Sequence, residues 1–347
     1  MRQLMILEPG RVQLREAPIP RAGKGEIVLK IRAALTCGTD LKTFRRGHPK
    51  FKLPMPFGHE YSGDVYEAGE GVTDFKPGDP VMLAPTAPCG KCSLCKRGLG
   101  NLCSYTMETM NHGGYAQFIK IPEHIVRTNV FSKTENLDYF EAAALEPLST
   151  VVHGASFINI DPGVSNVLII GAGPIGLMYI PVMRLKGAKT IAVIGRRALR
   201  LECARQMGAD CVIDEKNTSP QKIQSILRNV FGPQGCQAVI ECTGQTATWE
   251  SSFKMAADGG QVMLFGGCAG GTSFSIDAAE ITKRKLSIKG AFHFTPEAVR
   301  EARALLCAGE ISVAPIITHK IGLTQYDKMI EMMLAGESIK IGVDPDL

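Results

Sequence analysis

The sequence lacks a strong net charge, an internal repeat and a low-complexity tract, and these absences exclude several classes of protein. Among its 347 residues, 39 Lys and Arg stand against 34 Asp and Glu, a formal net charge of +5. No basic run or aromatic-spaced basic face stands out, so we expect no nucleic-acid partner. With 45% hydrophobic and 21% charged residues, the composition excludes wholesale disorder, collagen and a coiled coil, and is typical of a soluble globular protein.

Long apolar runs and an export signal are also missing. The most apolar stretch, Val167 to Met183, is interrupted by glycines and prolines and is short for a membrane span of ~20 residues. The opening MRQLMILEPG has no basic region followed by an apolar stretch, so no signal peptide is expected. We therefore expect a cytoplasmic, reduced protein without membrane contact. Its 11 cysteines, an odd number, then argue against a disulfide framework and leave thiols free to bind metal.

The length predicts about two domains at ~100–200 residues each. Short strands and glycine turns are expected over the first 150 residues. From about Val151 the pattern changes to apolar β runs that alternate with helical segments, such as Val167–Ile170, Ile175–Lys186 and Thr190–Ile194. Continuous apolar strands alternating with helices predict an α/β fold with a doubly wound parallel sheet.

Glycine is in excess, at 37 residues, and one group of glycines predicts a nucleotide site. The turn Gly171-Ala172-Gly173-Pro174-Ile175-Gly176 follows a β run and opens a helix. Such glycines permit a tight turn, close approach to a pyrophosphate and close helix–strand packing. The helix N-terminus presents N–H donors to the phosphates. A plain glycine-rich turn is the alternative, but the βαβ context favours dinucleotide binding.

The position that usually separates NAD from NADP carries no carboxylate. An acidic residue is expected ~20 residues past the glycine motif, where it accepts hydrogen bonds from the ribose. Here Gly195 stands at the end of the next β run, followed by Arg196 and Arg197, with Arg200 one helical turn on. Arginines can pair with a 2′-phosphate, which a carboxylate would repel. These residues predict NADP over NAD, the alternative being a solvated basic helix start.

Four cysteines lie close together in the sequence. Their spacing is Cys89-x2-Cys92-x2-Cys95-x7-Cys103. Structural zinc sites take four tetrahedral nitrogen or sulfur ligands, and one loop can supply them. An iron–sulfur cluster is the main alternative, but the bacterial spacing ends C-x3-C-P, unlike this one. The pattern therefore predicts a closed, structural zinc site.

A second group of potential ligands is dispersed. Cys37 follows a β run, His59 and Glu60 come some twenty residues later, and Glu146 precedes the nucleotide fold. A thiolate, an imidazole and carboxylates suit a catalytic metal with an exchangeable position. Each residue taken alone also fits an ordinary structural role, as a buried Cys, a core His or an exposed Glu.

Together these motifs resemble the zinc-containing medium-chain alcohol dehydrogenases, in the branch of polyol (sorbitol/L-iditol-type) and threonine dehydrogenases. The resemblance covers essentially the whole chain and implies a GroES-like, mostly β catalytic domain from residues 1–150 and 292–347. It implies a Rossmann domain from residues 151–291, an active site in the cleft and a homo-oligomer, usually a dimer or tetramer. It also implies two zinc ions per chain and a small-molecule alcohol or ketone as substrate.

The resemblance also implies roles for individual residues. Cys37 and His59 resemble the firm ligands of the catalytic zinc, and Glu60 and Glu146 resemble two carboxylates of which either can bind it directly. Asp40 resembles the carboxylate that orients the histidine. Thr39 resembles the hydroxyl that hydrogen-bonds the alcohol oxygen. The backbone near Gly266-Gly267 and over Ala291–His293 is expected to flank the nicotinamide.

Two departures from that pattern affect the substrate. Lys42 stands where relatives often carry a histidine proton relay, and His293 and Phe294 replace an Arg-Tyr pair that faces polyol hydroxyls. These departures predict a less polar pocket than in polyol dehydrogenases. We expect an NADP-preferring zinc dehydrogenase of a secondary alcohol or its ketone, with polyols and sugar-derived alcohols among the candidate substrates. The alternatives are an NADPH-dependent ketone or aldehyde reductase and a non-catalytic zinc- and nucleotide-binding protein. A basic loop with Arg45, Arg46, His48, Lys50 and Lys52 fits an anionic substrate, although a solvated loop is the simpler interpretation.

Overall fold

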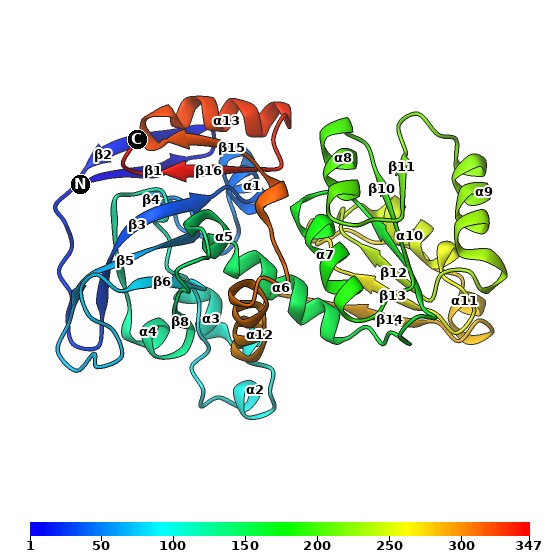
Figure 1. The fold of residues 1–347 in the computed structure, drawn as a ribbon, viewed down its shortest axis with the longest axis horizontal. Helices are drawn as coiled ribbons and strands as arrows, with labels where there is room; N and C mark the ends of the chain where they lie inside the picture. Colours follow the sequence, from blue (N-terminus) through cyan, green and yellow to red (C-terminus); the bar gives the residue numbers. More distant parts are fainter. The chain divides into compact units, whose positions relative to one another are not determined.

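The computed structural model describes residues 1–347, and the chain divides into two compact units. One unit combines Met1–Ser149 with Phe294–Leu347, and the other is Thr150–His293. Each unit has its own sheets (Figure 1) and its own buried apolar core. None of the helices combines the length and the apolar character that crossing a membrane requires.

The second unit is a doubly wound sheet of six parallel strands in the order β11-β10-β9-β12-β13-β14. The strands are β9 (Asn166–Ile170), β10 (Thr190–Gly195), β11 (Cys211–Asp214), β12 (Ala238–Glu241), β13 (Gln261–Leu264) and β14 (Ser287–Gly290). Their connecting helices are α7 (Pro174–Leu185), α8 (Ala198–Gln206), α9 (Pro220–Phe231), α10 (Thr246–Met255) and α11 (Ala278–Thr282) (Figure 1). The predicted α/β fold is confirmed.

The strand order of this sheet reverses at β9, which pairs with β10 on one side and with β12 on the other. The glycine turn Gly171–Gly176 follows β9 directly. In open α/β sheets, ligands bind beyond the carboxyl ends of the strands at such a reversal. The topology therefore places the glycine turn where a nucleotide is expected.

The first unit holds a seven-stranded sheet in the order β15-β16-β3-β5-β6-β8, with β7 also paired to β3, and a three-stranded sheet, β2-β1-β4. The strands are β1 (Arg2–Glu8), β2 (Arg11–Glu16), β3 (Ile27–Leu35), β4 (Met55–Pro56), β5 (Glu60–Ala68), β6 (Pro80–Leu83), β7 (Phe118–Ile121), β8 (Val130–Ser132), β15 (Ile317–Gly322) and β16 (Lys340–Asp344). The helices are α1 (Gly38–Arg46), α2 (Ser93–Lys96), α3 (Ser104–Glu108), α4 (Glu123–Asn129), α5 (Tyr139–Ala143), α12 (Pro296–Cys307) and α13 (Tyr326–Ala335), and α6 (Leu145–Ser156) runs across the division between the units.

Strand β3 brings distant segments of the chain together at its carboxyl end. It pairs antiparallel with β5, so that Leu35 lies opposite Glu60. On its other side it pairs antiparallel with β16, where Gly342 lies opposite Leu35. The first residues of β5 and β16 therefore flank the end of β3, at the point where the chain enters α1.

Candidate active site

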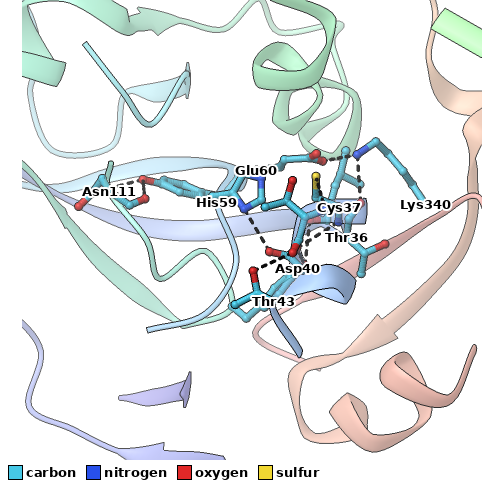
Figure 2. A network of polar contacts seen from close by, with 12 residues as sticks. Thr36, Cys37, Asp40, Thr43, His59, Glu60, Asn111 and Lys340 are labelled. Carbon is cyan, nitrogen blue, oxygen red and sulfur yellow. Dashed lines mark hydrogen bonds and ion pairs between the residues drawn. The ribbon is translucent and has the colours of Figure 1, made fainter. Parts of the chain in front are cut away.

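Three side chains at the end of β3 form a compact group with the character of metal ligands. The ligand atoms of Cys37, His59 and Glu60 all lie within 4.8 Å of one another. His59 and Glu60 are buried, and Cys37 is partly buried. Figure 2 shows the three side chains next to one another. The structure thus brings together three of the four residues expected at the catalytic zinc.

Cys37 is held by the start of helix α1. It is the N-cap residue, and its sulfur accepts a hydrogen bond from the backbone N–H of Thr39 at 3.4 Å. In return, the side chain of Asp40 accepts one from the backbone N–H of Cys37 at 3.1 Å. The positive end of a helix dipole favours negative charge on a capping group, which suits a thiolate ligand. Thr39, the expected partner of the alcohol oxygen, lies in the same first turn.

Asp40 links three parts of the site. Its Oδ1 lies 3.1 Å from Nδ1 of His59, and its Oδ2 accepts a hydrogen bond from the Tyr115 hydroxyl at 2.6 Å. Burial by itself would raise the pKa of Asp40, but His59 and the hydrogen bonds from Tyr115 and Cys37 lower it below its ordinary value. Because Asp40 engages Nδ1, it fixes the imidazole ring and leaves Nε2 to act as a metal ligand.

Glu60 is shared between the ligand group and a buried cation. Its Oε2 forms an ion pair with Nζ of Lys340, which also donates to the carbonyl of Thr36 at 3.0 Å (Figure 2). Its Oε1 is buried and has no hydrogen-bond partner. A buried acceptor of this kind is costly unless something binds it. One thiolate, one imidazole and a carboxylate oxygen fit a zinc ion that keeps a position for substrate.

Glu146 lies close to this group without belonging to it. It is buried in the first turn of α6 and is absent from the set of mutually close ligand atoms. Burial raises the pKa of Glu146 to about 7, and the charge of Glu60 adds to the effect although His59 opposes it. Of the two candidate carboxylates, the geometry therefore places Glu60, and not Glu146, beside Cys37 and His59.

The four-cysteine group is also assembled. The sulfurs of Cys89, Cys92, Cys95 and Cys103 lie within 4.8 Å of one another, with Cys92–Cys95 at 3.4 Å and Cys89–Cys95 at 3.9 Å. Tetrahedral zinc–sulfur bonds of ~2.3 Å place two sulfurs roughly 3.8 Å apart. The backbone N–H groups of Lys91 and Cys92 lower the pKa of Cys89 to about 6, whereas burial and the neighbouring thiol of Cys92 raise the pKa of Cys95. These residues fit a closed zinc site.

The second unit carries a pocket at the carboxyl ends of β9, β10 and β12. Among its lining residues are six of the predicted nucleotide-binding residues, namely Gly171, Gly173, Gly195, Arg196, Arg197 and Arg200. Gly173 is the N-cap of α7, whose first turn contains Pro174, Ile175 and Gly176. A Cβ atom on Gly176 would lie 2.0 Å from the carbonyl oxygen of Gly171, so this turn can close only with glycine there.

The wall of this pocket near β10 is basic. A Cβ on Gly195 would lie 2.7 Å from the Cβ of Ala172, so no acidic side chain fits at that position. Arg196 forms an ion pair with Glu215, with Nε and Oε2 2.7 Å apart. Burial, together with the charge of Arg197, lowers the pKa of Arg200. Three arginines and one carboxylate, Glu215, therefore line this wall.

Gly266, expected beside the nicotinamide, is not among the lining residues of the pocket. Its N–H donates to the carbonyl of Glu241 at 2.9 Å, and its carbonyl accepts from the Trp249 indole at 3.1 Å. The buried carboxylate of Glu241 accepts in turn from the Thr243 N–H at 2.7 Å and the Thr248 hydroxyl at 2.9 Å. Glu241 thereby holds the turn after β12, which does line the pocket.

Sequence reasoning missed three residues of these sites: Tyr115, Glu215 and Lys340. Lys340 could have been suspected, because it is a single charge within the apolar run Ile339–Val343. Glu215 follows the β run Cys211–Asp214, at the end of a strand where side chains reach a nucleotide. Tyr115 gives no such signal in the sequence, since its role depends on packing beside Asp40.

Comparison with known proteins agrees with this geometry. Residues 23–129 match the family model of the alcohol dehydrogenase GroES-like domain, and residues 174–308 match the model of zinc-binding dehydrogenases. The chain is 32% identical to an L-threonine 3-dehydrogenase of Bacillus licheniformis over 97% of this chain and 96% of the relative. It is 31% identical to human sorbitol dehydrogenase over 97% of this chain and 94% of the relative. A zinc-binding dehydrogenase of Sinorhizobium meliloti, solved with NADP bound, superposes with a TM-score of 0.88 at 30% identity, covering 99% of both chains.

Proposed function

Since this chain belongs to the family of zinc-dependent medium-chain alcohol dehydrogenases, we propose that it transfers hydride between NADP(H) and a secondary alcohol or its ketone. In the oxidative direction, the alcohol carbon gives a hydride to NADP⁺ and the hydroxyl gives its proton to solvent. The products are a ketone, NADPH and a proton. The observation that carries this proposal is the buried group Cys37–His59–Glu60, with its unsatisfied carboxylate oxygen.

The chemistry divides between the residues of the first unit and a metal ion. A zinc ion bound by Cys37, His59 and Glu60 would polarise the alcohol oxygen and stabilise the negative charge that it gains on losing its proton. Asp40 holds the ring of His59 in place, and Lys340 holds one oxygen of Glu60. Thr39, in the first turn of α1 after Cys37, would carry the proton away from the alcohol.

NADP is the preferred nucleotide in this proposal. Support comes from the exclusion of an acidic side chain at Gly195 and from the three arginines of the pocket wall. The Sinorhizobium meliloti relative binds NADP. The relatives are named for two different alcohols, L-threonine and sorbitol.

Replacing Arg200 tests the nucleotide assignment. Arg200→Ala is expected to raise KM for NADPH about tenfold or more, because a charge-assisted contact to phosphate is lost, and to change KM for NADH little. Arg205→Ala is the matched control, since Arg205 lies on the same helix, pairs with Glu202 and does not line the pocket. Equal changes of KM for both nucleotides would contradict NADP recognition by this wall.

A further inference from the structure

A concentration of positive charge follows the first ligand of the proposed catalytic zinc site. Residues 41–59 contain no Asp or Glu and five cationic side chains, Lys42, Arg45, Arg46, Lys50 and Lys52. The formal net charge of the entire chain is also +5. Residues 41–59, which include most of α1 and the loop after it, therefore carry as much excess positive charge as the whole protein.

A row of packed rings connects this loop to the ligand group. His48 stacks on Phe51 with ring centroids 3.9 Å apart, and Phe51 meets the edge of His112 at 4.5 Å. The ring of His112 lies 6.3 Å from that of His59. The basic loop is thus not a remote surface feature, because its rings continue to a predicted zinc ligand.

Three of the five cations gather around His48. Lys42 and Arg46 are four residues apart on α1 and so lie on the same face of that helix, and the backbone N–H of Lys50 donates a hydrogen bond to Nδ1 of His48 at 3.3 Å. Consistent with this arrangement, burial, followed by the charges of Lys50, Lys42 and Arg46, lowers the pKa of His48. We call Lys42, Arg46 and Lys50 the His48 cation cluster. Arg45 points elsewhere, with Nη2 donating to the carbonyl of Leu334 on α13 at 3.5 Å.

Two members of the cluster lack a carboxylate partner. Neither Lys42 nor Arg46 forms an ion pair with a carboxylate. Like charges held close together repel, and an anion placed among them relieves that repulsion. A guanidinium binds carboxylate or phosphate through two parallel hydrogen bonds, and lysines add charge without fixed geometry.

We propose that the alcohol substrate also carries an anionic group, a carboxylate or a phosphate, and that the His48 cation cluster binds this group. The proposal rests on the proposed function, because it assigns the substrate class of the same site. The cations are exposed to solvent, so their attraction acts over about one Debye length, ~8–10 Å, and weakens as salt increases.

Matched substrate pairs provide the test on the zinc-loaded full chain. Sorbitol 6-phosphate is compared with sorbitol, and 3-hydroxybutyrate with its methyl ester, by following NADPH absorbance. We expect kcat/KM to favour the anionic member in at least one pair, and that pair shows whether phosphate or carboxylate is recognised. The preference should fall as salt is raised from low to physiological concentration.

Two variants assign the effect to the cluster. Arg46→Gln is expected to raise KM for the anionic member about tenfold and to leave the neutral member within about twofold. Arg45→Gln removes a neighbouring charge outside the cluster and should change neither. Inorganic phosphate should inhibit competitively against any alcohol that is oxidised, about tenfold more weakly in Arg46→Gln than in the unmodified protein.

The outcomes separate the two proposals. If no alcohol is oxidised with either nucleotide, the proposed function fails, and the substrate assignment fails with it. If neutral alcohols are oxidised as well as their anionic partners in both pairs, the dehydrogenase stands and the anion site is refuted. Identical effects of Arg46→Gln and Arg45→Gln would also refute it.

Discussion

The two groups of metal-ligand side chains in the first unit are built in opposite ways. The four cysteines come from one stretch, Cys89 to Cys103, and three of them remain partly exposed. The other group draws Cys37 from the start of α1, His59 and Glu60 from the start of β5, and its buried counter-ion Lys340 from the last strand. One site closes within a local loop, and the other depends on the register of a whole sheet.

This difference in construction matches a difference in chemistry. Four sulfurs satisfy a zinc ion completely and leave nothing for a substrate, as a structural site requires. Cys37, His59 and Glu60 supply three ligands, and surrounding residues hold two of them in place. Burial, partial ligation and supporting hydrogen bonds are the properties of a reaction centre.

Replacing one cysteine in each group should give the largest contrast. Cys37→Ser is expected to abolish turnover and leave the melting temperature nearly unchanged, because its sulfur serves the reaction. Cys95→Ser should lower the melting temperature, because a structural zinc site contributes directly to folding energy. Thermal unfolding and steady-state rates measured on both variants check this. Loss of activity only through unfolding in both would remove the distinction.

A smaller effect is expected from replacing Lys340, the buried cation that pairs with Glu60. Lys340→Met should destabilise the first unit by about 3–5 kcal/mol, because it leaves a buried carboxylate without its counter-charge. Denaturant unfolding followed by circular dichroism measures the loss. The double variant Lys340→Met with Glu60→Gln removes the charge as well and should recover much of it. If the single and the double variant lose the same free energy of unfolding, Lys340 does not stabilise the fold by balancing the charge of Glu60.

The smallest effect is expected from Tyr115. Tyr115→Phe removes the hydroxyl that donates to Asp40, and should weaken zinc binding at Cys37–His59–Glu60 by about tenfold, at the lower end of the 10–100-fold loss typical of such outer partners. Competition with a chelator measures it, with the four-cysteine site as internal reference. Tyr61→Phe is the control, since Tyr61 is also buried but bonds to Asn111. Equal zinc loss in both variants would argue against the view that Tyr115 positions His59 through Asp40.

The features that the sequence patterns predicted by themselves are those encoded locally, whereas Cys37, His59 and Glu60 were expected at one zinc ion through the family resemblance. The glycine turn after β9, the alternation of strands and helices in the second unit and the cysteine spacing each depend on residues near one another in the chain. Local spacing is sufficient there, because a turn or a single loop fixes the geometry.

The features that were not predicted depend on strand pairing. Lys340 meets Glu60 only because β16 and β5 pair with opposite sides of β3. Tyr115 reaches Asp40 across 75 positions of sequence. The choice between Glu60 and Glu146 beside Cys37 likewise needs the register of β5 against β3. No spacing rule contains this information.

Counting zinc is the most direct test of the claim that one chain holds a structural site and a separate reaction centre. Elemental analysis of the purified full chain should give two zinc ions per chain. It should give one zinc ion per chain in Cys37→Ser and one in Cys95→Ser. Only the unmodified protein should combine two zinc ions with turnover. A single zinc ion in the unmodified chain, or two zinc ions in Cys37→Ser, would contradict the account.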